Sequence, residues 1–99
     1  NTDGSGNRVA ALIYGPKSVI VVVGMNKLVP DVEAALERIR SLAAPLNCQR
    51  LGRNTPCSVT GFCGECFGDD SICSSQVVTR RSHIKGRIKV ILVGESLGY

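Results

Sequence analysis

Aromatic residues are scarce in this sequence, which contains two Tyr, two Phe and no Trp among its 99 residues. The core must therefore be built from Val, Ile, Leu and Ala, which favours layers of strands and helices. Long apolar runs are also missing: residues 19–23 form the longest, far short of the roughly 20 residues that a membrane span needs. No cationic stretch followed by an apolar one opens the chain, so we expect no export signal and a reducing, cytoplasmic setting.

Histidine is almost absent as well, since His83 is the only one. It lies in a basic stretch with no nucleophile or orienting acid beside it, so we interpret it as a loop residue and not as a catalytic base. Glu33 and Glu37 lie on the polar face of a predicted helix and do not form an acid–base pair. The sequence therefore gives no catalytic residues, and whether the protein is an enzyme stays open.

The overall composition, 43% hydrophobic and 20% charged residues, is typical of one small globular domain. The chain begins at Asn1 in a turn-rich segment, from which we expect that a natural N-terminal portion is missing. Its formal net charge is +4 with neutral thiols, and thiolates bound to a divalent metal would reduce this charge. Four arginines flank the cysteines and are expected to offset an anionic metal–thiolate centre. They are Arg50, Arg53, Arg80 and Arg81.

Cysteine, by contrast, is plentiful: the chain has five, and four of them follow the spacing C-x5-C-x2-C-x6-C. Thiolate sulfur is a strong ligand for zinc and for iron–sulfur clusters, and the Gly and Pro residues around these cysteines allow turns that bring four sulfurs together. We therefore expect a four-cysteine metal site in a surface knob at residues 55–74. Its predicted ligands are Cys57, Cys63, Cys66 and Cys73.

Three other interpretations of these cysteines stay open: a disulfide framework, a redox pair at Cys63 and Cys66, and four unrelated reduced thiols. The odd number of cysteines argues against the framework, and a redox pair usually follows a strand and opens a helix. The spacing matches neither a zinc ribbon nor a ferredoxin; structural zinc is preferred, with an iron–sulfur cluster as the alternative. Cys48 lies outside the run and is expected to pack as a small apolar side chain.

Capping residues and apolar patterns predict the first two elements. Asn7 as N-cap, with Gly15 beyond the last turn, indicates a helix over residues 8–14, for which a strand is the rival interpretation. Residues 17–24 form a continuous β-branched run, typical of a strand that is buried on both faces at the centre of a parallel sheet.

The rest of the chain predicts one longer helix and two more strands. Residues 30–44 carry an apolar stripe at helical spacing, and we expect Pro45 to end that helix. Residues 75–79 and 87–93 are expected to be strands. The sequence therefore predicts an α/β fold with a mainly parallel sheet.

Two glycine-containing loops before predicted helices are candidate sites for a small carboxylate or phosphate. The first carries an arginine that offers a fork of donors to an anion. The second follows the strand at residues 17–24 at its carboxyl end, where open α/β sheets bind ligands. The alternative is that the glycines only allow tight turns and that the lysine is a solvated loop residue. The predicted ligand-binding residues are Gly4, Gly6, Asn7, Arg8, Gly24, Asn26 and Lys27.

Two further functional hypotheses stay open. One is a nucleic-acid-binding zinc module, which is less favoured because its basic segment has no aromatic residues on which bases could stack. The other makes the cysteine knob a docking surface for a redox partner subunit. The basic residues of the first hypothesis are Arg80, Arg81, Lys85, Arg87 and Lys89.

Seven short motifs occur along the chain: Asp3-Gly4-Ser5-Gly6-Asn7-Arg8, Tyr14-Gly15-Pro16-Lys17, Val23-Gly24-Met25-Asn26-Lys27, Ala44-Pro45-Leu46-Asn47, Thr55-Pro56-Cys57, Thr60-Gly61-Phe62-Cys63 and Val93-Gly94-Glu95-Ser96-Leu97-Gly98. With these motifs in this order, the chain resembles the LUD-domain family over nearly its whole length. The resemblance is to the lactate utilisation protein C type, in its cysteine-containing branch.

This resemblance implies a Rossmann-like sheet related to the ribose-phosphate isomerase and CoA-transferase superfamily. It also implies a link to L-lactate oxidation through an iron–sulfur-containing complex, with a small anionic ligand and an iron–sulfur subunit as partners. The family's domain is longer, so residues 1–99 are expected to be its C-terminal portion, with a cysteine-rich insertion at residues 55–74. Assembly into a homo-oligomer stays open, and no membrane partner is expected.

Overall fold

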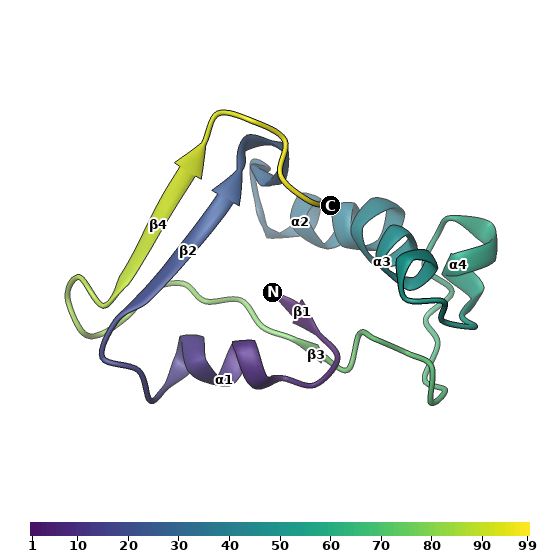
Figure 1. The fold of residues 1–99 in the computed structure, drawn as a ribbon, viewed down its shortest axis with the longest axis horizontal. Coiled ribbons are helices and arrows are strands. Elements are labelled where there is room, and N and C mark those ends of the chain that lie inside the picture. The colour runs from purple at the N-terminus through teal and green to yellow at the C-terminus, as the bar shows by residue number, and fades with distance from the viewer.

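The computed structural model describes all residues, 1–99, and has two small sheets and several short helices (Figure 1). The pair β2 and β4 lies at one end of the molecule, and α3 and α4 lie at the other. In chain order the elements are β1 (Thr2–Asp3), α1 (Asn7–Ile13), β2 (Val19–Gly24), the 3₁₀ turn η1 (Met25–Lys27), α2 (Val32–Arg38), the π-helical turn η2 (Ile39–Ala43), α3 (Ala44–Arg50), α4 (Pro56–Thr60), β3 (Ser75–Gln76) and β4 (Ile88–Val93).

The larger sheet consists of β2 and β4, which run parallel with Val19 opposite Ile88 and Gly24 opposite Val93. Both strands and their parallel direction confirm the prediction. The expected burial of β2 on both faces is wrong: Ile20 is 62% and Val22 60% exposed, because no helix layer covers that face. The α/β class is therefore confirmed, whereas a Rossmann-like arrangement of a larger sheet is not.

The smaller sheet pairs β1 with β3 in antiparallel fashion, with Thr2 opposite Gln76 and Asp3 opposite Ser75. The strand predicted at residues 75–79 is thus present but shorter, since only Ser75–Gln76 finds a partner strand. This pairing holds the start of the chain against the segment that leaves the cysteine-rich region.

Helix α1 confirms the helical interpretation of residues 8–14 over the rival strand. It begins after Gly6, whose φ of 76° is a left-handed conformation that glycine adopts without strain. Its buried residue is Val9. No helix of the chain combines the length and the apolar character that crossing a membrane requires.

The predicted end of the long helix at Pro45 is wrong, because the helical path continues from α2 through η2 into α3. Asp31 caps its start by accepting the Ala34 N–H at 2.8 Å. In η2 the Ala44 N–H donates to the Ile39 carbonyl, one residue further back than in an α-helix. Pro45 then lies in the first turn of α3, where a residue without an N–H is tolerated.

Arg87 connects the larger sheet to α1. Arg87 is only 6% exposed, and its guanidinium donates to two backbone carbonyls in the last turn of that helix and to one just beyond it. A positive charge is favourable there because the carbonyls at a helix C-terminus lack partners and carry partial negative charge. The acceptors are Pro16 at 2.9 Å, Leu12 at 2.6 Å and Ala11 at 2.9 Å.

Candidate cysteine-lined site

Helix α4 places the first cysteine of the predicted site. Only turns were predicted here, although Pro56 at the first helical position and Gly61 after the last turn are ordinary start and stop signals of a helix. Ser58 Oγ accepts the Thr55 N–H at 3.4 Å, and Gly61, with φ 77°, donates its N–H to the Cys57 carbonyl at 3.0 Å. This single helical segment directs Cys57 inward, where it is 6% exposed.

All five cysteines are free thiols, and they come from α3, α4 and the loop that follows α4. Cys48 is the most buried side chain in the chain at 1% exposure. The pKa of its thiol is raised, first by burial and also by the neighbouring Cys57. Thr55 Oγ1 in turn lies 3.3 Å from Cys57 Sγ. Cys48 therefore packs as predicted, but beside another cysteine.

The electrostatics connect these thiols into one group, which we call the five-cysteine cluster: Cys48, Cys57, Cys63, Cys66 and Cys73. Burial, followed by the charges of the other four cysteines, raises the pKa of Cys73 to about 11. Burial is also the largest cause of the raised pKa of Cys48, and contact with Cys57 and the charges of Cys57 and Cys66 act in the same direction. The other four cysteines are thus near enough to Cys73 for their charges to act on it.

A closed metal cage is not formed, since no group of three or more His, Cys, Asp or Glu side chains is arranged to hold a metal ion. The donor chemistry nevertheless suits a thiophilic metal, because the chain offers five free thiols. The metal site of Cys57, Cys63, Cys66 and Cys73 therefore stays a prediction, as does the choice between zinc and an iron–sulfur cluster.

The loop that carries Cys63 and Cys66 is fixed to η2 by two contacts. The Cys63 N–H donates to the Arg40 carbonyl at 2.9 Å, and the Arg40 guanidinium pairs with Glu65 at 2.7 Å. Within the C-x2-C turn the Glu65 N–H donates to Cys63 Sγ at 3.4 Å. Glu65 has a positive φ of 50°, the only non-glycine residue in the chain to do so.

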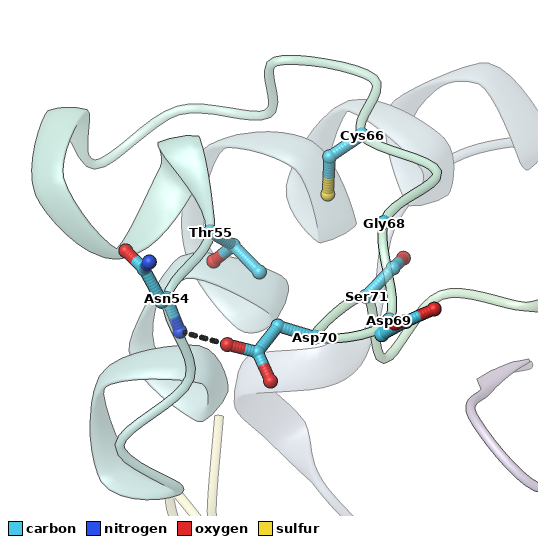
Figure 2. Close-up of a pocket in the computed structure, with 7 residues that line it drawn as sticks. All are labelled: Asn54, Thr55, Cys66, Gly68, Asp69, Asp70 and Ser71. Carbon is cyan, nitrogen blue, oxygen red and sulfur yellow. Dashed lines mark hydrogen bonds between the residues drawn. The ribbon is translucent and has the colours of Figure 1, made fainter.

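A cavity of about 270 Å³ lies beside the cluster (Figure 2). The sulfur of Cys66 and the side chain of Thr55 both contribute to its lining. Asp70 closes one side by accepting the Asn54 N–H at 2.9 Å and the Arg53 guanidinium at 3.4 Å. The residues that line the cavity are Asn54, Thr55, Cys66, Gly68, Asp69, Asp70 and Ser71.

In the first predicted ligand loop, at residues 4–8, the polar groups already form hydrogen bonds within the protein. The buried Asp3 carboxylate accepts the Arg8 Nε–H at 2.9 Å and the N–H groups of Ser5 and Gly6, both at 3.2 Å. The hydrogen bond from Arg8 is the main reason why the pKa of Asp3 is lowered. A Cβ on Gly4 would lie 3.3 Å from the Ile72 carbonyl oxygen. These contacts favour the tight-turn interpretation, and ligand binding by Gly4, Gly6, Asn7 and Arg8 stays a prediction.

The second predicted ligand loop lies at the carboxyl ends of β2 and β4, under the last residues of the chain (Figure 1). Asn26 uses its amide to hold those residues: Nδ2 donates to the Gly98 carbonyl at 3.0 Å and Oδ1 accepts the Leu97 N–H at 3.1 Å. Gly24 is buried beneath them, whereas Lys27 is exposed. Unlike the Asn26 amide, the Lys27 ammonium makes no hydrogen bond within the protein, so it could bind a ligand without breaking one.

The basic segment of the nucleic-acid hypothesis is not a continuous cationic surface. Arg87 is buried against α1, and Lys89 donates to Ser18 Oγ at 3.1 Å. Arg80, Arg81 and Lys85 are exposed. His83 lies exposed among them, as expected of a loop residue.

Sequence reasoning missed two members of the site, Thr55 and the cluster position of Cys48. The signal for Cys48 was its spacing from Ala44 and Pro45, which places all three on one side of a helix. That signal was lost because the helix was expected to end at Pro45.

A protein-family model for the LUD domain matches residues 1–93, nearly the whole chain. No curated protein and no solved structure gives a match. The family model supports the resemblance found from the seven motifs, while the lactate utilisation protein C branch within it is not resolved. The chain therefore belongs to the LUD-domain family.

Proposed function

We propose that this LUD-domain protein serves lactate-utilisation metabolism and that its five-cysteine cluster binds a thiophilic metal centre, with Cys57, Cys63, Cys66 and Cys73 as ligands. The observation that carries the proposal is the presence of five free thiols on α3, α4 and the loop after α4. Structural zinc and an iron–sulfur cluster are both compatible with this donor set. The link to L-lactate oxidation and an iron–sulfur partner subunit rests on family membership.

A metal centre would stabilise the loop that carries three of the cysteines. None of residues 61–74 is buried, so packing alone gives this loop little stability. Residues 61–74 contain no helix or strand. Because metal–thiolate bonds form only when the chain folds around the ion, their binding free energy becomes folding free energy. A metal would thus fix a region that apolar burial leaves weakly held.

The metal is expected to be present at about one centre per chain in anaerobically purified protein, and to be lost when Cys66 and Cys73 are both replaced by serine. Elemental analysis gives the metal content, and the absorption spectrum separates colourless zinc from an iron–sulfur cluster, which absorbs near about 400 nm. Ser74→Ala, beside Cys73 and exposed, is the matched control and should keep full occupancy. A metal-free wild-type protein with normal reduced thiols would contradict the proposal.

We also propose that Lys27 binds a small carboxylate or phosphate at the carboxyl ends of β2 and β4. Its support is the free ammonium group at the position where open parallel sheets hold ligands. The Gly4 to Arg8 loop is the weaker candidate, because Arg8 already pairs with Asp3.

Titration calorimetry with lactate, pyruvate and a sugar phosphate tests this site. Lys27→Ala should weaken binding of the preferred anion at least about tenfold, since it removes the main charged contact. Lys85→Ala removes the same charge from another exposed loop and should leave binding unchanged. Equal affinities for wild type and Lys27→Ala would rule Lys27 out.

A further inference from the structure

Strand β4 has one edge without a partner strand. The larger sheet contains only β2 and β4, so β2 covers one edge of β4 and the other edge is open, on the outer side of the molecule (Figure 1). Val19 lies opposite Ile88, and its N–H donates to the Arg87 carbonyl at 2.8 Å. In a parallel ladder with this register, the backbone groups of residues 87, 89, 91 and 93 face β2, whereas the N–H and C=O groups of residues 88, 90 and 92 point to the open edge.

The side chains along β4 are apolar and exposed on both faces of the sheet. Val90 is 59% and Leu92 51% exposed on one face, and Ile91 is 50% exposed on the other. Proteins commonly protect such an edge with a proline, a bulge or a charged side chain. Residues 88–93 contain no proline and pair with β2 without a bulge, and their one charged residue, Lys89, reaches back to Ser18 beside β2. The open edge of β4 is therefore suited to pair with another strand.

The charges near β4 indicate the chemistry of that strand. No acidic residue occurs between Asp70 and Glu95, whereas the segment that leads into β4 and opens it is strongly basic. The exposed cations of this segment are Arg80, Arg81, Lys85 and Lys89. A partner strand with acidic residues beside the amino end of β4 complements these charges. A second copy of the chain is a poorer match, because it brings the same basic segment and a net charge of +4.

A nucleic acid would also match the cations, but it does not match the rest of the surface. The open edge presents a row of backbone donors and acceptors between exposed apolar side chains. An extended polypeptide supplies both the complementary backbone groups and apolar side chains at alternate positions. These features favour a protein segment over a polynucleotide.

We propose that the open edge of β4 binds an extended segment of a partner protein, which adds a third strand to the sheet. The segment carries apolar residues along β4 and acidic residues beside the amino end of β4. In this mode of recognition, backbone hydrogen bonds give affinity, while side chains and charges give specificity. Neither the cysteines nor Lys27 takes part, so this surface is independent of the proposed function.

The probes are fluorescein-labelled peptides of alternating threonine and valine that carry two glutamates at one end. Glutamates at the amino end suit a parallel third strand, and glutamates at the carboxyl end suit an antiparallel one. Fluorescence anisotropy measures their binding to the 99-residue chain. We expect one of the two to bind at least about tenfold more tightly than the same peptide with lysines in place of the glutamates, and the difference to shrink in high salt.

Val90→Pro tests the open edge directly. It removes an N–H that points to this edge and not to β2, and proline is tolerated in an edge strand in that orientation. We expect it to weaken peptide binding at least about tenfold. Val90→Thr keeps the N–H and a β-branched side chain, so it is the matched control and should bind the peptide as wild type does. Circular dichroism establishes that both variants keep the fold.

A matched pair of peptides keeps the test decisive even if Val90→Pro does not fold. One peptide is N-methylated at odd positions and the other at even positions, so that in an added strand the methyl groups of only one peptide meet β4. We expect one methylated peptide to bind and the other to fail. Equal binding by the two would exclude strand addition.

Four other results would overturn the inference. They are no binding of either glutamate peptide, equal affinities for the glutamate and lysine peptides, and wild-type affinity in a folded Val90→Pro variant. The fourth is a wild-type dimer in sedimentation equilibrium that Val90→Pro converts to a monomer, because the occupant of the edge would then be a second copy.

Discussion

Replacing Arg87 by methionine is expected to lower the free energy of unfolding by about 3 kcal/mol, which is a large part of the stability of a small domain. Methionine keeps most of the apolar stem but removes every donor, so the carbonyls of Pro16, Leu12 and Ala11 lose their partner. Arg87 is only 6% exposed, so water cannot simply replace its guanidinium. Urea unfolding followed by circular dichroism measures the loss.

Lys89→Met is the matched control. Lys89 lies two residues further along, on the same face of the strand, but it is exposed and makes a single hydrogen bond to Ser18. Its replacement should change stability by less than about 0.5 kcal/mol. If Arg87→Met and Lys89→Met were equally mild, the connection between α1 and β4 would contribute little to the fold.

Gly24→Ala is expected to cost about 3 kcal/mol through overpacking at the carboxyl end of β2. A Cβ there would lie 2.5 Å from Asn26 Oδ1, 2.6 Å from the Leu97 nitrogen and 2.8 Å from the Glu95 oxygen. Two of these atoms belong to the backbone, which cannot move without releasing the last residues of the chain. A fall in melting temperature and faster proteolysis of residues 94–99 should appear together.

Gly94→Ala, one residue beyond the end of β4, provides the comparison. A Cβ at Gly94 meets no atom within 4 Å, and its backbone is not in the left-handed region. Alanine there should therefore be neutral within about 0.5 kcal/mol. If Gly24→Ala were equally neutral, the close approach of residues 94–99 to β2 would not be a constraint in solution.

The elements that were predicted correctly are those whose signals are local. The β-branched run at residues 17–24 and the apolar run at residues 87–93 favour strands in any surroundings, and Gly15 marks the end of α1. Their parallel pairing confirms the α/β class. Which faces they bury could not be predicted, because burial depends on layers that lie elsewhere in space.

The site was harder to predict because its geometry depends on two helices that the sequence analysis ended or omitted. The four cysteines of the run were identified from chemistry alone. The position of Cys48 beside Cys57 requires that α3 continue past Pro45 and that α4 pack against it. Thr55 gave no signal of its own, since a threonine before a proline is ordinary in a turn.

The π-helical turn η2 and Pro45 together release one hydrogen-bond acceptor. In η2 the Ala44 N–H donates to the Ile39 carbonyl and not to the Arg40 carbonyl, which it would reach in an α-helix. The next residue, Pro45, has no N–H that could donate to the Arg40 carbonyl in its place. That vacant acceptor takes the Cys63 N–H at 2.9 Å. An amide proton restored at position 45 would compete for the same oxygen, so the proline that was expected to end a helix instead leaves this carbonyl free for the loop that carries Cys63 and Cys66.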